Sequence, residues 1–262
     1  MADRPMTTKI HHAAAEGFAS HAEAYARGRP DYPPQAVDWL REDVGVAAGK
    51  TVLDLGSGTG KFLSTLRATG AKMIAVEPVA AMRAQLVAKN PDVEALEGTA
   101  ESIPLPAESV DAVVCAQAFH WFATPRALAE IRRVLKPGGA LGLIWNARDE
   151  SVDWVRAITD IITPYEGDAP RYYTGKWREV FPAEGFGPLA ARRFPWVHSG
   201  APENVIVDRT CSSSFIAALP ADEHAAVAAR LRALIEATPV LAGRAHIEYP
   251  YVTEAFVTRK QS

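Results

Sequence analysis

Three closely spaced glycines at the end of an apolar run give the clearest indication of chemistry in this chain. The segment VLDLGSGTG (52–60) predicts a buried strand that ends in a glycine-rich turn, and Lys61 opens the following helix. Because glycine lacks a Cβ and adopts positive φ angles, such a turn lets a ligand approach the backbone closely. The segment therefore predicts a nucleotide-like ligand at a strand-to-helix turn.

The spacing of the glycines separates this turn from two other phosphate-binding motifs. A Walker P-loop requires a glycine where Leu55 stands and a Ser or Thr where Phe62 stands. The dinucleotide fingerprint G-x-G-x-x-G requires its third glycine at the position of Lys61. Asp54, just before the turn, would repel a pyrophosphate but could balance a positive ligand. The residues thus favour a cationic ligand over a polyanion.

Together with three later segments, the turn resembles the class I S-adenosylmethionine-dependent methyltransferases, of the methyltransferase type 11 family. Glu77 ends the apolar run 73–76, and the resemblance implies that it binds the ribose hydroxyls. Residues 98–106 are similar to the family's adenine-contacting loop, and 135–144 to its turn and fifth strand. The motif order and the Phe-His-Trp-Phe segment at 119–122 resemble a branch that includes trans-aconitate methyltransferase-like enzymes.

The resemblance implies S-adenosyl-L-methionine as the cofactor and a set of residues that bind it. Thr99 stands where many members carry an aspartate that accepts a hydrogen bond from the adenine, so this contact passes to Glu101 or to the backbone near Ala100. Tyr25 and Arg29 fit a Tyr-x-x-x-Arg-Pro-x-Tyr-Pro pattern, which either binds the donor's carboxylate or packs the tail onto the core. The predicted cofactor-binding residues are Asp54, Gly56, Ser57, Gly58, Gly60, Glu77, Pro78, Thr99, Ala100, Glu101, Gln117, Tyr25 and Arg29.

Residues that follow the fourth and fifth predicted strands are the candidates for contact with the methyl acceptor. His120 is the one predicted catalytic residue, because a histidine can act as a base near neutral pH if the acceptor is a hydroxyl; otherwise it is a wall of the pocket. Arg148 would favour an acceptor with a carboxylate, or it is exposed on the surface. The predicted acceptor residues are Phe119, His120, Trp121, Trp145 and Arg148.

We expect a methyltransferase that acts on a small molecule, at an oxygen of a carboxylate or a hydroxyl, with nitrogen and carbon acceptors left open. Methyl transfer from a sulfonium is an in-line displacement, so alignment of the reacting atoms matters more than acid–base machinery. One alternative is a nicotinamide-dependent oxidoreductase on a Rossmann core, against which Asp54 and the glycine spacing argue. Another is a non-catalytic S-adenosylmethionine-binding protein.

Composition limits the partners and the location. The 262 residues, with 48% hydrophobic residues and a net charge of −3, predict a single α/β unit that does not bind nucleic acid. The sequence has only two cysteines, Cys115 and Cys211, far apart, and it lacks a signal peptide or a long apolar segment. These features predict a cytoplasmic protein without membrane contact. We expect a monomer or a homodimer. No metal site is expected from His11, His12 and His21.

The pattern along the chain predicts an α/β fold, namely a Rossmann-like three-layer sandwich with a mostly parallel seven-stranded sheet. Continuous apolar runs joined by amphipathic helices are typical of a parallel sheet that is buried on both faces. The last strand is expected to be antiparallel. The predicted strands are 51–55, 72–76, 93–96, 110–116, 140–146, 191–198 and 246–258, and the predicted helices are 61–69, 79–89, 124–135, 151–163 and 221–236.

Three regions are expected along the chain. Residues 1–36 form an N-terminal lead-in or lid, and 37–147 form the S-adenosylmethionine-binding core. Residues 148–262 complete the sheet and contain an inserted helical cap, 199–244, over the acceptor. In an open α/β sheet, ligands bind at the carboxyl ends of the strands, so the predicted site residues converge there.

Overall fold

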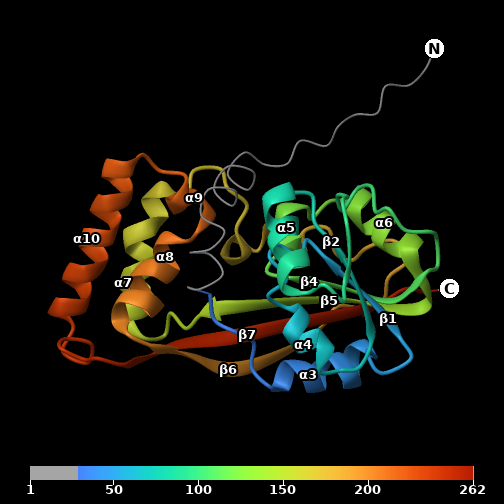
Figure 1. Cartoon of the computed structure of the whole chain (residues 1–262), viewed down its shortest axis with the longest axis horizontal. Helices are drawn as coiled ribbons and strands as arrows, with labels where there is room; N and C mark the ends of the chain where they lie inside the picture. The colour runs from blue at the N-terminus through green and yellow to red at the C-terminus, as the bar shows by residue number, and fades with distance from the viewer. Residues whose placement is uncertain (1–28, 262) are drawn as a thin grey trace, which may run out of the picture.

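The computed structural model describes residues 29–261 and is built around a seven-stranded sheet in the order β3-β2-β1-β4-β5-β7-β6 (Figure 1). Each strand matches an apolar run of the sequence to within a few residues, except that β5 begins earlier than expected. The strands are β1 Thr51–Leu55, β2 Lys72–Val76, β3 Glu94–Leu96, β4 Val110–Ala116, β5 Leu135–Arg148, β6 Ala190–Gly200 and β7 Ile247–Arg259.

Strand direction agrees with the expected fold. Strands β1 to β5 pair in parallel, whereas β7 pairs antiparallel with both β5 and β6. The mostly parallel sheet with an antiparallel last strand is thus confirmed. Because β7 lies between β5 and β6, the edge of the sheet is formed by β6.

Both faces of the parallel part of the sheet are covered, which explains why β1 and β4 are almost continuously apolar, whereas the edge strand β6 is largely exposed. On one face, α6 contributes Leu128 and Ile131 to a core that also contains Leu53 of β1 and Val113 of β4. On the other face, α3, α4 and α5 pack over the alternate side chains of the same strands. The helices are α3 Gln35–Trp39, α4 Leu63–Arg67, α5 Ala80–Lys89, α6 Pro125–Val134, α7 Asp153–Ile162, α8 Arg209–Cys211, α9 Ser214–Ala217 and α10 Ala221–Ala237.

Shorter helical turns connect these elements. The segment expected to form a helical cap folds as η6, α8, α9 and α10, which pack with α7 around the first half of β7 in a third hydrophobic core. In Figure 1 these helices gather at one end of the long strands β5, β6 and β7, apart from α3 to α6. The turns are η1 Leu40–Val44, η2 Phe119–Trp121, η3 Thr163–Tyr165, η4 Tyr172–Thr174, η5 Lys176–Arg178 and η6 Glu203–Asp208.

Two features of the helices bear on the prediction. The first helix after the glycine turn begins at Leu63, two residues later than expected, because Gly60 adopts a φ of 79° and its N–H closes a turn onto the Ser57 carbonyl. By contrast, α6 begins as expected, with Pro125 at its first position and the Thr124 hydroxyl accepting a hydrogen bond from the Ala127 N–H. Among residues 29–261, no helix has both the length and the apolar character that crossing a membrane requires.

Candidate functional site

A cavity of about 180 Å³ opens where β1, β2 and β4 end. Most of the predicted cofactor residues line it, and they come from five separate segments of the chain. Those on its wall are Asp54, Gly56, Ser57, Gly58, Glu77, Pro78, Thr99, Ala100, Glu101, Gln117 and Arg29. Tyr25 lies outside the described residues, as does most of the predicted lid, whose end nevertheless contributes Arg29, Pro30 and Tyr32 to the wall.

The three glycines of the turn have different roles. All have positive φ angles, of 73° at Gly56, 57° at Gly58 and 79° at Gly60. A Cβ at Gly58 would meet only the Met82 side chain, at 3.8 Å, so this glycine leaves space open toward the cavity. A Cβ at Gly60 would lie 2.9 Å from both Asn90 and Leu63. Gly60 is absent from the cavity wall and serves the packing of the turn, which differs from its predicted role as a ligand contact.

Asp54 presents an unusual carboxylate to this cavity. Its side chain is fully buried, and neither oxygen has a hydrogen-bond partner. Burial, with a further contribution from the nearby Glu77, raises the pKa of Asp54 to about 7. A buried acceptor without a donor is costly, so a ligand with a cationic or N–H group would stabilise the site.

Glu77 organises the glycine turn in addition to facing the cavity. One carboxylate oxygen accepts a hydrogen bond from the Gly58 N–H and the other from the Val79 N–H, both at 2.8 Å. Burial raises the pKa of Glu77, while these two hydrogen bonds oppose the rise. Since each oxygen has a second lone pair, the carboxylate can still accept hydrogen bonds from a pair of ligand hydroxyls.

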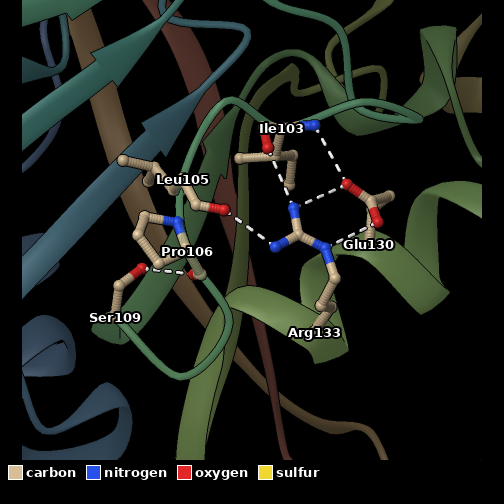
Figure 2. Close-up of polar contacts among 6 residues, drawn as sticks. All are labelled: Ile103, Leu105, Pro106, Ser109, Glu130 and Arg133. Atoms are coloured by element: carbon tan, nitrogen blue, oxygen red, sulfur yellow. Dashed lines mark hydrogen bonds and ion pairs between the residues drawn. The ribbon is translucent and has the colours of Figure 1, made fainter.

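The loop predicted to contact the adenine is held in place by an arginine of α6. The Arg133 guanidinium donates to the carbonyl oxygens of Ile103 and Leu105, at 2.9 and 2.8 Å, and forms a two-pronged ion pair with Glu130 (Figure 2). Glu130 in turn accepts a hydrogen bond from the Ile103 N–H. Residues 103–105 are thereby tied to α6, just beyond the part of the loop, Thr99 to Glu101, that lines the cavity.

A second, smaller cavity of about 80 Å³ adjoins the first, and Arg29, Gln117 and Trp121 lie on the walls of both. Gln117 follows β4 with a φ of 60°, which is uncommon for a residue other than glycine and is typical of functional sites. The remaining wall comes from η2, from β5 and from later segments. These residues are His120, Asn146, Arg148, Pro170, Arg171, Tyr172, Tyr173, Arg209, Ser213 and Ser214.

His120 has a geometry that differs from that of a free base. Its Nδ1 accepts a hydrogen bond of 3.1 Å from the Trp145 indole N–H, which places the remaining ring proton on Nε2. Burial, together with the positive charges of Arg171 and Arg29, lowers the pKa of His120 to about 3. The ring is therefore neutral near pH 7, and its Nε2–H can donate a hydrogen bond. The geometry thus favours a hydrogen-bonding role for His120 over the role of a base, which the sequence suggested.

The other predicted acceptor residues divide into two groups. Trp121 and Arg148 lie on the wall of the second cavity, whereas Phe119 and Trp145 are fully buried in the core under the sheet. Trp145 is linked to the site by its hydrogen bond to His120 and by its ring contact with Tyr172, at 4.8 Å between centroids. The sequence did not lead us to Arg171 or Arg209. For Arg209, the position of a charged residue within the mainly apolar segment 205–211 could have indicated a buried functional arginine. Among residues 29–261, no cluster of three or more potential metal ligands is present.

Comparison with known proteins identifies the family of this chain. Residues 53–143 match the family described as a methyltransferase domain. An uncharacterized methyltransferase-like protein of Schizosaccharomyces pombe is 39% identical over 93% of this chain and 95% of its own length. An uncharacterized methyltransferase of Mycobacterium tuberculosis is 42% identical over 90% of this chain and 92% of its own length. The chain belongs to the methyltransferase family.

Solved structures share the fold at lower identity. A methyltransferase from an antibiotic biosynthesis pathway of Anabaena variabilis has a TM-score of 0.60 at 20% identity, covering 88% of this chain and 98% of that one. A phosphoethanolamine N-methyltransferase of Haemonchus contortus, in complex with S-adenosyl-L-methionine, has a TM-score of 0.59 at 13% identity, covering 98% and 61%. The class I methyltransferase fold expected from the sequence is confirmed. The narrower resemblance to trans-aconitate methyltransferase-like enzymes stays a prediction.

Proposed function

We propose that this protein transfers a methyl group to an oxygen of a small molecule, and that this oxygen belongs to a carboxylate. S-adenosyl-L-methionine is the methyl donor of the family and hence the cofactor. The observation that carries the proposal is the pair of adjoining cavities that share Arg29, Gln117 and Trp121. One cavity has the residues for the donor, and the other opens beside it, where an acceptor can be aligned for in-line displacement.

The first cavity fits the donor on its own residues. The unpartnered carboxylate of Asp54 suits the donor's ammonium group, and the free lone pairs of Glu77 suit the two ribose hydroxyls. The open space beside Gly58 admits a ligand close to the backbone. The segment Thr99 to Glu101 is positioned to contact the adenine, and Arg29 to pair with the donor's carboxylate.

The state of His120 favours a carboxylate over a hydroxyl as the acceptor. A hydroxyl must lose its proton during the transfer, which calls for a base whose pKa lies near the working pH. His120 is neutral, and the lone pair on its Nδ1 is already occupied by Trp145. A carboxylate is ionised near pH 7 and needs no base. The Nε2–H of His120 can then hold the acceptor by a hydrogen bond.

The bound donor supplies an electrophilic methyl carbon on its sulfonium. The acceptor oxygen forms a bond to this carbon as the carbon–sulfur bond breaks, and the electron pair of that bond stays on sulfur. A methyl ester and S-adenosylhomocysteine result, with no proton exchanged. The residues of the chain orient the acceptor and exclude water, which is where catalysis of such a displacement arises.

The competing functions are separable by experiment. Membership in the methyltransferase family argues against the nicotinamide-dependent oxidoreductase, and calorimetric titration with S-adenosylhomocysteine and with NADH tests this directly. Micromolar affinity for the first and none for the second is expected. A non-catalytic binding protein would also bind S-adenosylhomocysteine, so incubation with radiolabelled donor and a set of small organic acids decides between binding and turnover. Binding of NADH alone would refute the proposal.

A further inference from the structure

Two deeply buried arginines have side-chain nitrogen atoms without a hydrogen-bond partner. Arg148 ends β5 and Arg209 begins α8, and they are only 6% and 7% exposed. Both line the second cavity. Arginine is almost never this deeply buried unless it is paired, so two such residues on one small cavity call for an explanation.

Neither guanidinium has the partners that burial requires. The Nε atom of Arg148, and the Nε and one terminal nitrogen of Arg209, are buried without a hydrogen-bond partner. The ion pairs formed within residues 29–261 include Arg171 but neither of these two arginines. A buried charge that is incompletely hydrogen-bonded destabilises a fold. Such a cost is typical of a binding site whose missing partner is the ligand.

A third arginine adds to the positive charge. Arg171 lies 3.4 Å from Glu166, its guanidinium stacks 4.2 Å above the Phe215 ring, and it also lines the cavity. Burial, together with repulsion from Arg148 and Arg209, lowers the pKa of Arg171 to about 10, while the attraction of Glu166 opposes this shift. Glu166 lies near Arg171 and Glu150 near Arg148, so two carboxylates oppose three guanidinium groups and this end of the cavity has a net positive charge.

Hydroxyl groups complete the wall around these charges. Ser213, Ser214 and Tyr172 line the same cavity, and the Tyr172 hydroxyl is buried without a hydrogen-bond partner. Guanidinium and hydroxyl donors that converge on a small enclosed space are suited to the oxygens of carboxylates and phosphates. These hydrogen-bond donors come from β5, from residues 170–173 and from residues 209–214. The helical segment after β6 therefore closes this end of the site.

We propose that the methyl acceptor carries a second acidic group, apart from the oxygen that is methylated, and that Arg148, Arg171 and Arg209 bind this group. The proposal rests on the function proposed above, because it assigns the substrate class of the same enzyme. The acceptor is a small molecule of at least two negative charges, such as a dicarboxylic acid or a phosphorylated acid. Its anchoring anion lies at the arginines, and its nucleophilic oxygen points toward Gln117 and Trp121, where the two cavities meet.

The donor's own carboxylate does not account for these arginines. It is a single anion, and Arg29, which lies on both cavities, is already placed to bind it. Arg148, Arg171 and Arg209 line the second cavity alone, on the far side of the shared residues. Three further guanidinium groups exceed what one carboxylate can satisfy with its two oxygens.

The test measures anion binding to the full chain, with and without saturating S-adenosylhomocysteine. Thermal unfolding is followed in sodium succinate and in sodium phosphate, against sodium chloride of equal ionic strength. The variants are Arg209→Gln and Arg148→Gln, and Arg230→Gln, on the exposed face of α10, removes the same charge outside the cavity. Calorimetry gives the affinity of each variant for S-adenosylhomocysteine.

We expect succinate or phosphate to raise the melting temperature of the wild type and of Arg230→Gln more than chloride does. Each cavity variant should bind the effective anion at least about tenfold more weakly, with affinity for S-adenosylhomocysteine within about twofold of the wild type. Without anion, Arg209→Gln should melt no lower than the wild type, since it removes an unpaired buried charge. A response to succinate alone identifies a dicarboxylic acid, and a response to phosphate alone a phosphorylated one.

Three results would overturn the assignment. One is that neither anion stabilises the wild type beyond chloride, and another is that both cavity variants respond like Arg230→Gln. The third is a tenfold loss of S-adenosylhomocysteine affinity in the cavity variants, which would place the arginines in the donor site. A wild type that binds the anion but not S-adenosylhomocysteine would refute the proposed methyl transfer while leaving the anion site in place, so the two failures are distinguishable.

Discussion

The imidazole of His120 accepts a hydrogen bond at Nδ1 from the indole nitrogen of Trp145, over 3.1 Å. This contact joins the fully buried Trp145 on β5 to the histidine that follows β4. It fixes which ring nitrogen carries the proton, and so decides whether the site presents a base or a hydrogen-bond donor to the acceptor. Because Nδ1 already accepts the Trp145 hydrogen bond, His120 presents a hydrogen-bond donor, Nε2–H, to the acceptor.

The protonation state of His120 can be measured without knowing the acceptor. Since burial and the charges of Arg171 and Arg29 lower its pKa to about 3, we expect its ring to stay neutral, with the proton on Nε2, from pH 5 to pH 8. Nitrogen-15 NMR of the imidazoles reports both the tautomer and the titration, and the spectrum of His120→Gln identifies the signal. A signal that titrates near pH 6.5 would disprove the assignment.

A second prediction concerns turnover by the same residue. His120→Gln keeps an N–H donor but removes the imidazole, so the rate with a carboxylate acceptor should fall by no more than about tenfold, whereas loss of a general base costs 10²–10⁴. Single-turnover kinetics at saturating donor measure this rate. A loss of a thousandfold would restore His120 as a base.

Donor affinity should depend on pH through Asp54. With a pKa of about 7, Asp54 is partly protonated at neutral pH, and a bound ammonium group requires the carboxylate. Affinity for S-adenosylhomocysteine should therefore fall as pH drops below 7, by up to tenfold per unit, and binding at pH 6 should release a proton. Calorimetry in two buffers of different ionisation enthalpy measures this release.

The matched variants for this prediction are Asp54→Asn and Asp153→Asn. The first removes the charge inside the cavity, and the second removes one at the exposed start of α7. Asp54→Asn should weaken the binding of S-adenosylhomocysteine by about tenfold to a hundredfold, and it should abolish the proton release on binding. In the wild type, the pKa of Asp54 is raised to about 7 in the folded state, so the free energy of unfolding falls as pH rises from about 4 to 7. Asp54→Asn lacks this loss, so the ligand-free variant should gain stability relative to the wild type over the same pH range. Equal proton release in both variants would be incompatible with this role of Asp54.

Two glycines of the same turn should respond in opposite ways. Gly58→Ala places a methyl group where only Met82 is near, so affinity for S-adenosylhomocysteine should fall by tenfold or more with a small loss of stability. Gly60→Ala places one against Asn90, Leu63 and Leu86, so the fold should lose about 2 kcal/mol or more. Chemical denaturation and calorimetry on the two variants test the pair. Similar effects of both changes on stability and on affinity would show that the two positions are not distinct.

The clamp between Arg133 and the adenine loop should matter for the donor although neither Arg133 nor Glu130 lines its cavity (Figure 2). Arg133→Met releases the carbonyls of Ile103 and Leu105, so amide hydrogen exchange across 98–106 should accelerate and S-adenosylhomocysteine should bind several-fold more weakly. Arg132→Met, one residue away on α6 and paired only loosely with Glu184, is the control. Unchanged exchange in Arg133→Met would exclude a positioning role.

The cavity proposed to bind the donor could be predicted from the sequence because its residues lie close to strand ends. Asp54, Glu77 and Gln117 each follow or end an apolar run, and parallel strands bring such ends to one edge. The strands themselves were found for the same reason, since burial on both faces leaves continuous apolar runs. What the pattern could not reveal was which glycines face the cavity, because Gly60 contacts Asn90, which follows α5 and is distant in sequence.

The cavity proposed to bind the acceptor was harder to predict because it depends on contacts between distant segments. Arg171 and Arg209 reach the cavity only once residues 170–173 and 209–214 fold against β5, and no local periodicity encodes that meeting. Trp145 was placed in the acceptor site by its position after the fifth predicted strand. In the structure β5 continues to Arg148, so Trp145 stays inside the strand and its ring packs against Trp177 in the core.

The most direct test of carboxylate methylation uses donor labelled in the transferred methyl group, incubated with the protein and a set of small di- and tricarboxylic and phosphorylated acids. Methyl esters hydrolyse in alkali and release volatile labelled methanol, whereas methyl ethers and methylamines do not. We predict label in an alkali-labile product with the wild type and a loss of at least about tenfold with Asp54→Asn. Label found only in alkali-stable products, or no transfer to any acid, would contradict the account.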